Sequence, residues 1–279
     1  MLQMKSYPCA KINLGLNVTG RRADGYHDLE TVFYPVGVCD EIEMSVIGDG
    51  SPARIELTTE SLAGGPWGAL CGDAGDNLVV RAYNMLASRY RLPAVRVVLR
   101  KGIPVQAGMG GGSADGAYML RMLNDMACLG LDDDALRGYA SSLGADCAFF
   151  VCPRPSYAEG IGDRLSPVDV DLSDYKIAIV KPPVAVSTRE AFAGVRVGRP
   201  RLSCRDIVTR SVERWRDVLH NDFEDTVFAV RPLLGDIKSR LYDMGAVYAS
   251  MSGSGSALYG LFRSVPDMSC FDGCFTTVV

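Results

Sequence analysis

The sequence has few residues of the kinds that build zinc sites and disulfide frameworks. It contains only two His residues, and its nine Cys residues are scattered, with no C-x-x-C pair. A structural zinc site needs Cys and His ligands at close, regular spacing, so the sequence does not support one. The odd number of Cys residues and the lack of an apolar leader segment favour reduced thiols, and we expect a cytoplasmic protein.

Long apolar runs and blocks of basic residues are also missing. No run approaches the roughly 20 apolar residues that a membrane-spanning helix requires, so we expect a soluble chain without a membrane partner. The net charge is −4 and no Lys/Arg cluster stands out, which gives no electrostatic support to an extended nucleic-acid surface. The expected partners are therefore small molecules, and the sequence leaves the oligomeric state open.

Apolar content, in contrast, is ample. The chain has 279 residues, of which 48% are hydrophobic, and this length exceeds that of a usual single domain. Strand and helix patterns occur in both halves, which predicts an α+β fold. Pro and Gly are concentrated in residues 153–167, so we expect a boundary there, with domains at 1–155 and 156–279.

Periodicity in the apolar residues predicts the main elements. Strand patterns predict strands at 12–17, 31–36, 41–47 and 95–101, a buried strand at 175–181, and two more strands around a second glycine loop in 246–262. Helical spacing predicts helices within 76–90, 113–129, 132–144, 187–194, 211–230 and 233–245. The short apolar run Cys147–Cys152 is interpreted as a buried strand that follows Asp146.

The densest glycine cluster lies in Pro104–Leu120, between a predicted strand and a predicted helix. It holds Gly108, Gly110, Gly111 and Gly112. Because glycine loses the most backbone freedom on folding, such a cluster indicates positive φ angles or a close approach. Ser113 is a candidate N-cap of the helix, with Asp115 in the first turn. Backbone N–H groups at a helix N-terminus bind anions, so this arrangement predicts a phosphate site.

Neither common phosphate-loop motif matches this stretch. The motif G-x-x-x-x-G-K-[ST] fails because no Lys follows the glycines, and G-x-G-x-x-G fails because Ser113 stands at its last glycine. The chain also lacks the βαβ alternation of a dinucleotide-binding domain, which disfavours a nucleotide-binding oxidoreductase. A flexible surface loop is the plain alternative.

Three segments together resemble the motifs of the GHMP kinase superfamily, small-molecule kinases whose central loop wraps the phosphates of ATP. In chain order they are "PCAKINLGLNVTGRRADGYHDLETVF", "PVQAGMGGGSADGAYML" and "SMSGSGSALYGLF". The first has the form found in kinases of the non-mevalonate isoprenoid pathway that act on a cytidine diphosphate sugar alcohol. The resemblance implies a two-domain α+β fold, with a ribosomal-protein-like ATP-binding domain, a ferredoxin-like C-terminal domain and the active site in the cleft between them.

The resemblance also implies a reaction, the transfer of a phosphoryl group from ATP to the 2-hydroxyl of the methylerythritol portion of the substrate. Such a transfer needs positioning and charge stabilisation more than covalent chemistry from the protein. Lys11 matches the family's active-site lysine, and Asp146 matches the carboxylate that accepts or orients the hydroxyl proton. Without the resemblance, Lys11 reads as a solvated strand lysine and Asp146 as a turn residue.

The ATP site that the resemblance implies is centred on the glycine loop, and the implied cofactors are ATP and Mg²⁺. Ser113 either caps the helix or binds the magnesium ion or a phosphate. Asn77 and Lys101 match positions near the adenine pocket, although they could equally be a helix cap and an exposed lysine at a strand end. The implied ATP-binding residues are Asn77, Lys101, Pro104, Ala107, Gly108, Met109, Gly110, Gly111, Gly112, Ser113 and Ala114.

On the substrate side, the resemblance implies Asn13, Tyr26, His27 and Thr188. An aromatic face can stack on cytosine while an imidazole hydrogen-bonds the edge of the base, which suits Tyr26 and His27. A turn-packing aromatic, a surface histidine and a helix N-cap at Thr188 with Ser187 are the alternatives.

The same sequence features argue against two other functions. Asn13 and Gly25-Tyr26-His27 weigh against another GHMP kinase, such as a homoserine or mevalonate kinase. The negative net charge opposes a non-catalytic RNA-binding module on the same fold.

Two departures from the family's loop are visible. Ala114 and Asp115 stand where Ser and Asn are common, which would place a negative charge beside the phosphates. Gln106 and Ala107 replace expected glycines.

Overall fold

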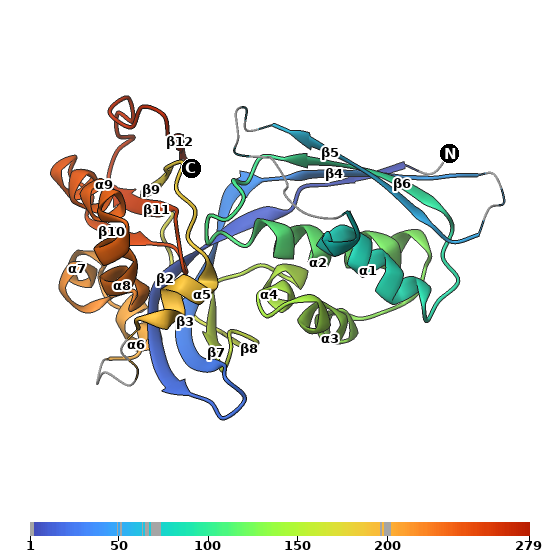
Figure 1. Ribbon diagram of the computed structural model, residues 1–279, viewed down its shortest axis with the longest axis horizontal. Coiled ribbons are helices and arrows are strands. Elements are labelled where there is room, and N and C mark those ends of the chain that lie inside the picture. Colours follow the sequence, from blue (N-terminus) through green and yellow to red (C-terminus); the bar gives the residue numbers. More distant parts are fainter. Residues whose placement is uncertain are drawn as a thin grey trace. The chain divides into compact units, whose positions relative to one another are not determined.

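A computed structural model gives the fold and describes residues 3–48, 50, 52–62, 64, 67, 74–195, 197 and 202–279 (Figure 1). Contacts divide the chain into two compact units. Unit 1 comprises residues 1–10, 37–105 and 110–153, and unit 2 comprises residues 11–36, 106–109 and 154–279. The change of unit at 153/154 lies beside the expected domain boundary, but residues 11–36 and 106–109 group with the C-terminal part of the chain.

Unit 1 contains a sheet with the strand order β1-β4-β6-β5. Its strands are β1 (Gln3–Ser6), β4 (Glu41–Val46), β5 (Ile55–Ser61) and β6 (Val95–Lys101). β5 runs parallel to β6, with Thr58 opposite Val98, and the other pairs are antiparallel. Alternate residues of β6 are buried from Val95 to Lys101, so the strand predicted at 95–101 is confirmed.

Helices of unit 1 lie along one face of this sheet (Figure 1). They are η1 (Ala74–Asp76), α1 (Leu78–Ala87), α2 (Gly111–Met126), α3 (Asp133–Leu143) and α4 (Cys147–Val151). Asn77 caps α1 through its side chain, which is one of the two alternatives stated for this residue, and Asp132 caps α3 in the same way. The prediction of a strand in the run CAFFVC is wrong, since this segment forms α4 with all five side chains buried.

Unit 2 contains two further sheets, with the orders β2-β3-β7-β8 and β10-β11-β9-β12. The first is made of β2 (Cys9–Arg21), β3 (His27–Cys39), β7 (Ser156–Glu159) and β8 (Arg164–Pro167). The second is made of β9 (Lys176–Lys181), β10 (Tyr248–Met251), β11 (Leu258–Phe262) and β12 (Phe275–Val278). Every residue of β10 and β11 is buried, and both predicted strands around the second glycine loop are confirmed.

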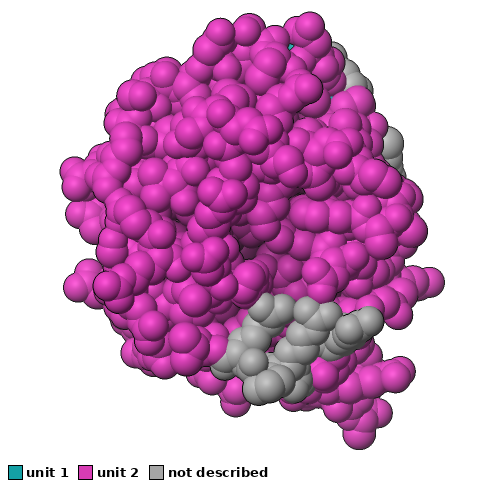
Figure 2. Space-filling model, turned by 90° about the vertical axis from the view of Figure 1, so that its left-hand side faces the viewer, with its two compact units in different colours: residues 1–10, 37–105, 110–153 teal, residues 11–36, 106–109, 154–279 magenta. Residues whose placement is uncertain are grey.

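The helices of unit 2 are short. They are α5 (Thr188–Ala193), α6 (Cys204–Val208), η2 (Val212–Arg214), α7 (Trp215–Val218), α8 (Phe223–Val230) and α9 (Pro232–Asp243). Side chains of α8 and α9, among them Phe223, Leu234 and Leu241, share a buried core with β9, β10 and β11. Figure 2 shows the surface of unit 2 from the side on which α7, α8 and α9 lie in Figure 1.

One predicted helix of unit 2 is interrupted. The sequence predicts continuous helical structure across 211–230, whereas the chain leaves the helical path between α7 and α8. There Leu16 of β2 pairs with Asn221, because Leu16 N–H donates to His220 O and Asp222 N–H donates to Leu16 O, each at 2.8 Å. A non-local pairing with a strand therefore breaks a locally favourable helix.

The mixture of helices and sheets confirms the predicted α+β class. Among the described residues, no helix is long and apolar enough to cross a membrane. The same residues contain no group of three or more His, Cys, Asp or Glu side chains arranged to hold a metal ion.

Candidate active site

Lys11 lies on β2 in unit 2 and is only 3% exposed. Its Nζ donates to Oδ1 of Asn13 at 2.6 Å and to the carbonyl oxygen of Gly108 at 3.0 Å. Its backbone N–H donates to Met109 O at 3.0 Å, and Nζ lies 4.9 Å from the centre of the Phe33 ring. The alternative of a solvated strand lysine is therefore wrong. A buried ammonium needs such polar partners, because burial without them is costly.

Asn13 lies two residues further along β2, so its side chain is on the same face of the strand as that of Lys11. While Oδ1 accepts from Lys11, Nδ2 donates to Oγ1 of Thr31 at 3.0 Å. Its backbone is held by the C-terminal part of unit 2, since its N–H donates to Ser252 Oγ at 3.3 Å and Tyr259 donates to its carbonyl oxygen at 2.9 Å. Asn13 thus fixes the position of the Lys11 ammonium.

The two glycine loops meet inside unit 2. The second loop joins β10 to β11 and spans residues 252–257. Ser252 Oγ donates to the carbonyl oxygen of Gly108 at 2.8 Å, and the Ala257 N–H donates to Ala107 O at 3.1 Å. Residues 106–109 therefore lie between β2 and the second loop, so segments that are far apart in the sequence contribute to one cluster around Lys11.

Close packing explains why position 108 is a glycine. Its φ is +71°, and a Cβ atom there would lie 2.0 Å from the carbonyl oxygen of Ser252. Gln106 also has a positive φ, of 51°. The backbone there has the conformation that glycine favours, which is the residue expected from the family's loop.

The other part of the first glycine loop begins α2 in unit 1. The N-cap is Gly110, with φ of 73°, and it offers no side-chain hydrogen bond. Ser113 is the third residue of the helix, so the prediction that Ser113 is the N-cap is wrong, and Asp115 lies beyond the first turn. A Cβ atom at Gly112 would have no atom within 4 Å. The first turn of α2 thus offers an open backbone surface.

Asp146 lies close to this helix N-terminus. It directly precedes Cys147, the first residue of α4, and the Cys147 thiol is hydrogen-bonded to the Ser113 side chain. Burial is the main cause that raises the pKa of the Cys147 thiol to about 11. The charge of Asp146 adds to this increase, and the hydrogen bond with Ser113 opposes it. Asp146 is partly exposed, and its side chain does not cap α4. Unit 1 therefore brings its part of the glycine loop and the predicted catalytic carboxylate together.

Lys101 is buried between two carboxylates of unit 1. Its Nζ pairs with Asp115 Oδ2 at 2.6 Å and with Asp40 Oδ2, and it is 1% exposed. Asp40 Oδ1 also accepts from the backbone N–H groups of Gly102 and Ile103, at 2.7 and 2.8 Å. The alternative of an exposed strand-end lysine is wrong. Lys101, Asp40 and Asp115 thus form a buried triad, which links the segment between β6 and the glycine loop to the beginning of β4.

Because Asp115 belongs to this triad, the expectation that it places its charge beside the phosphates is wrong. Asp115 is 2% exposed and faces the Lys101 ammonium. Burial raises the pKa of Asp115 well above its usual range and Asp40 adds to this effect, whereas Lys101 opposes it. Burial would lower the pKa of Lys101, but the attraction of both carboxylates outweighs it and raises that pKa. The acid is part of the interior of unit 1.

Tyr26 and His27 stand at the beginning of β3. Tyr26 is 63% exposed, and the His27 ring stacks on Phe192 of α5, with ring centres 4.7 Å apart and an angle of 17° between the planes. Phe192 in turn packs edge-on against Phe223 at 4.7 Å. One face of the imidazole is therefore covered by protein, while the tyrosine ring is open to solvent.

Thr188 is the first residue of α5 and is exposed. Ser187 is the N-cap and forms a capping box with Glu190, so the alternative in which Thr188 serves as the cap is wrong. Thr188 Oγ1 lies 3.5 Å from Oγ of Ser254 in the second glycine loop. This contact places Thr188 beside that loop.

The remaining predicted ATP residues have structural settings of their own. Asn77 is the N-cap of α1, and its side chain accepts from Val79 N–H at 2.9 Å. Buried residues among this set are Pro104, Ala107, Met109 and Ala114.

Sequence reasoning missed two residues that shape the site. Ser252 joins Asn13 to Gly108, and the quoted third motif contained the signal, because its serine precedes a glycine. Phe192 supports His27, and nothing in the local pattern of a short helix distinguishes it from an ordinary core aromatic.

Comparison with known proteins identifies the class. The model of the GHMP kinase N-terminal domain matches residues 77–154, and that of the GHMP kinase C-terminal domain matches residues 205–267. A relative from Bacteroides fragilis, named 4-diphosphocytidyl-2-C-methyl-D-erythritol kinase, is 48% identical over 278 residues, covering 98% of this chain and 99% of its own.

Solved structures agree with this class. The crystal structure of a 4-(cytidine 5'-diphospho)-2C-methyl-D-erythritol kinase has a TM-score of 0.77 and 32% identity, covering 92% of this chain and 90% of its own. A homoserine kinase from Cytophaga hutchinsonii, at 15% identity, shares the fold with a TM-score of 0.60, covering 94% of this chain and 85% of its own.

The matched family models and the fold are those of a small-molecule kinase that uses ATP. The chain belongs to the family of 4-diphosphocytidyl-2-C-methyl-D-erythritol kinases, within the GHMP kinases.

Proposed function

We propose that this chain transfers the γ-phosphoryl group of ATP to the 2-hydroxyl of 4-diphosphocytidyl-2-C-methyl-D-erythritol, giving the 2-phosphate. The observation that carries the proposal is the Lys11 ammonium, buried and held by Asn13 and Gly108 where the two glycine loops meet. A fixed cation at such a place stabilises charge on a transferring phosphoryl group without reorganising during the reaction.

The first turn of α2 is the proposed binding site for the ATP phosphates. Its N-cap lacks a side-chain hydrogen bond and Gly112 leaves open space, so backbone N–H groups can approach an anion. The α2 dipole favours negative charge at this end.

Magnesium would be held chiefly by the phosphate oxygens of ATP, because the described residues contain no cluster of acidic ligands. Ser113, whose hydroxyl lies in the first turn of α2, is the proposed protein ligand. When bound, the ion would offset charge on the phosphates.

Asp146 is proposed to accept or orient the proton of the attacking hydroxyl. Its position beside Cys147, which contacts Ser113, suits a group that acts near the γ-phosphoryl end of ATP.

Cytosine recognition is proposed for Tyr26 and His27. The exposed Tyr26 ring offers a stacking face, and Phe192 holds His27 in one orientation so that its ring nitrogens can meet the edge of a base. Thr188, beside Ser254, is the proposed contact to the sugar alcohol. Asn13 acts by holding Lys11. Asn77 and Lys101 are proposed to support the ATP site through the fold, as a helix cap and a buried ion pair.

The test of the reaction is a competition among alcohols. The protein is incubated with Mg-ATP and, separately, with 4-diphosphocytidyl-2-C-methyl-D-erythritol, mevalonate and homoserine, and products are followed by phosphorus NMR. We expect a new phosphate monoester with the first substrate alone. Phosphorylation of mevalonate or homoserine at a comparable rate would overturn the substrate assignment.

The roles of Lys11 and Asp146 are tested by Lys11→Met and Asp146→Asn. Each variant should lose at least about 10²-fold in kcat while still binding an ATP analogue, because general acid–base and electrostatic contributions are of that size. Asp134→Asn, which changes an exposed acid of α3, is the matched control. If Asp146→Asn turned over like Asp134→Asn, Asp146 would have no part in the chemistry.

A further inference from the structure

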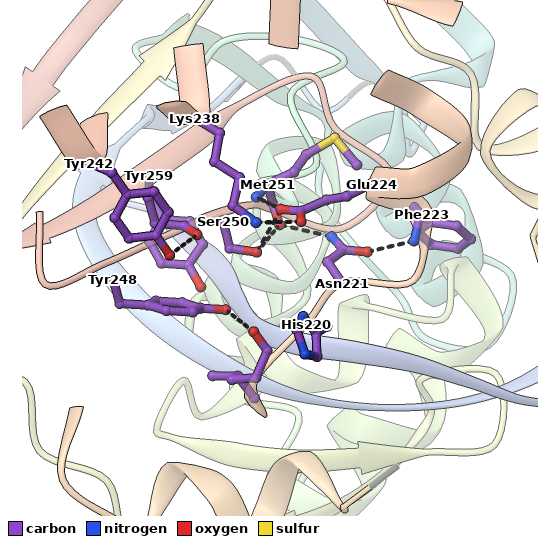
Figure 3. A network of polar contacts seen from close by, with 12 residues as sticks. His220, Asn221, Phe223, Glu224, Lys238, Tyr242, Tyr248, Ser250, Met251 and Tyr259 are labelled. Carbon is purple, nitrogen blue, oxygen red and sulfur yellow. Dashed lines mark hydrogen bonds and ion pairs between the residues drawn. The ribbon is translucent and has the colours of Figure 1, made fainter. Parts of the chain in front are cut away.

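Asn221 is a buried amide that joins β2 to the second glycine loop. It is 3% exposed, and its Nδ2 donates to two carbonyl oxygens, those of Met251 and Gly253, each at 2.8 Å (Figure 3). Its Oδ1 accepts from the Phe223 N–H at 3.0 Å. Asn221 also pairs with Leu16 of β2, the strand that carries Lys11. All three polar groups of its side chain are therefore engaged.

Glu224 holds the strand that enters the same loop. Its Oε1 accepts from the Met251 N–H at 2.8 Å and from Ser250 Oγ at 3.0 Å, and its Oε2 pairs with Lys238 of α9 at 2.5 Å (Figure 3). The loop is thus held on its entering side by Asn221, which lies in the segment that interrupts the predicted helix, and by Glu224 in the first turn of α8. This part of the chain therefore supports the second glycine loop through hydrogen bonds and also packs in the core of unit 2.

The held residues lie beside Gly108 and Asn13, the two hydrogen-bond partners of the Lys11 ammonium. Ser252 lies between the two carbonyls that Asn221 holds, and its Oγ donates to Gly108 O at 2.8 Å. At Gly253, a Cβ atom would lie 3.2 Å from Asn13 Oδ1 and 3.6 Å from Lys11 Nζ. A movement of the loop by a fraction of an ångström would therefore change the surroundings of the lysine.

We infer that Asn221 is a positioning residue for phosphoryl transfer, which fixes the second glycine loop against Lys11 and Gly108. The inference rests on the proposed function, because it takes Lys11 as the cation that acts on the phosphoryl group. Asn221 does not itself touch the reacting atoms. It acts through Gly253 and Ser252, so its removal should lower the rate of the chemical step more than it weakens the binding of ATP.

The experiment uses Asn221→Asp, which keeps the acceptor for Phe223 N–H but removes both donated hydrogen bonds. Asn221→Ser is a second variant, because its short hydroxyl cannot reach both carbonyl oxygens. It replaces Asn221→Asp in the experiment if the buried carboxylate of that variant prevents folding. Asn124→Asp is the matched control. Asn124 also holds a loop through its amide, by bonds to the N–H and carbonyl of Leu131 at 2.9 and 3.2 Å, but in the α2–α3 connection of unit 1.

Three quantities are measured at a temperature at which each variant is folded. For a folded Asn221 variant we expect kcat to fall at least about tenfold, while the Kd of a non-hydrolysable ATP analogue changes less than about threefold. We also expect faster amide hydrogen exchange in the peptide that spans residues 251–257. Asn124→Asp should leave kcat and the exchange of this peptide unchanged.

An unchanged kcat in the folded Asn221 variants would overturn the inference. Equal losses of kcat in the Asn221 and Asn124 variants would also overturn it, because they would indicate general destabilisation. Amide hydrogen exchange is measured without substrate. Unchanged exchange in residues 251–257 of the Asn221 variants would therefore refute the positioning role even if the proposed reaction is correct. Failure of the proposed function is recognised separately, by absence of turnover in the unmodified protein.

Discussion

A single added methyl group should have opposite effects at two glycines of the first loop. Gly108→Ala would force a Cβ atom to 2.0 Å from a backbone oxygen at a positive φ, and we expect a loss of about 3 kcal/mol in the free energy of unfolding. Gly112→Ala meets open space within α2, and we expect a gain of roughly 0.5–1 kcal/mol, because alanine loses less backbone entropy.

Urea denaturation of the two variants beside the unmodified protein measures this difference. Equal stabilities of Gly108→Ala and Gly112→Ala would show that the Gly108–Ser252 approach does not constrain the loop.

Removal of the Lys101 charge leaves two acids without their common partner. For Lys101→Met we expect a loss of about 3–5 kcal/mol, because breaking a buried pair leaves uncompensated buried charge. Lys101 opposes the raised pKa of Asp115, so in this variant the folded-state pKa of Asp115 should lie still further above its unfolded value, and the loss should grow as pH rises above about 4.

Denaturation midpoints between pH 5 and pH 8 test this expectation. Lys176→Met, at an exposed position of β9, is the control and should change the free energy of unfolding by no more than about 0.5 kcal/mol. A Lys101→Met protein as stable as this control would contradict the buried triad.

Features that depend on local pattern were predictable, and those that depend on distant partners were not. The family motif drew attention to Lys11 without predicting its burial, and the burial of Lys101 depends on Asp40 and Asp115, which no local pattern connects to it. Ser113 was misjudged as a cap because Gly110, in the left-handed region, begins the helix earlier than side-chain preferences suggest.

At the scale of elements, the capping of α5 should control the substrate side of the site. Ser187 and Glu190 form a capping box, and the same short helix carries Thr188 and Phe192. Ser187→Ala should destabilise the helix by about 1 kcal/mol. Because Phe192 supports His27, we expect KM for the cytidine substrate to rise by up to about fivefold, the equivalent of that free energy, with KM for ATP unchanged.

Steady-state kinetics with each substrate varied in turn measures the effect. Asp132→Ala removes the equivalent cap of α3 in unit 1 and serves as the control. A rise in KM for the cytidine substrate in both variants would mean that α5 has no specific part in recognition.

Elements with clear caps and periodicity were predicted, including α1, α3, β6, β10 and β11. The run CAFFVC was misassigned because a short apolar segment has too few residues for periodicity to separate a strand from a buried helix. The helix predicted across 211–230 was interrupted by its pairing with Leu16, a contact 205 positions away that no local window contains.

At the scale of the whole molecule, the interleaved units imply that the chain cannot be divided at residue 153. Residues 11–36 belong to unit 2, and β3 pairs with β7 through Thr31 opposite Ala158. A fragment of residues 1–153 would expose β3 as an unpaired edge, and one of residues 154–279 would lack β2 and β3.

We expect neither fragment alone to unfold cooperatively, and co-expression to restore the kinase activity. Circular dichroism melting curves of the separate and combined fragments provide the measurement. A cooperative transition in the fragment of residues 154–279 by itself would contradict the assignment of β2 and β3 to that unit. Sequence composition predicts a boundary between residues 155 and 156 but could not show this interleaving, because the pairing of β3 with β7 is long-range.

The arrangement of the thiols has a practical consequence. Cys128 and Cys270 are exposed, whereas Cys147 is fully buried beside Ser113, with a pKa of about 11. At pH 7.5 a maleimide dye should therefore modify the two surface thiols and spare Cys147, which mass spectrometry of labelled peptides can verify. Fluorescent reporters could then be attached to the natural chain while the first turn of α2, the proposed site for the ATP phosphates, stays chemically intact.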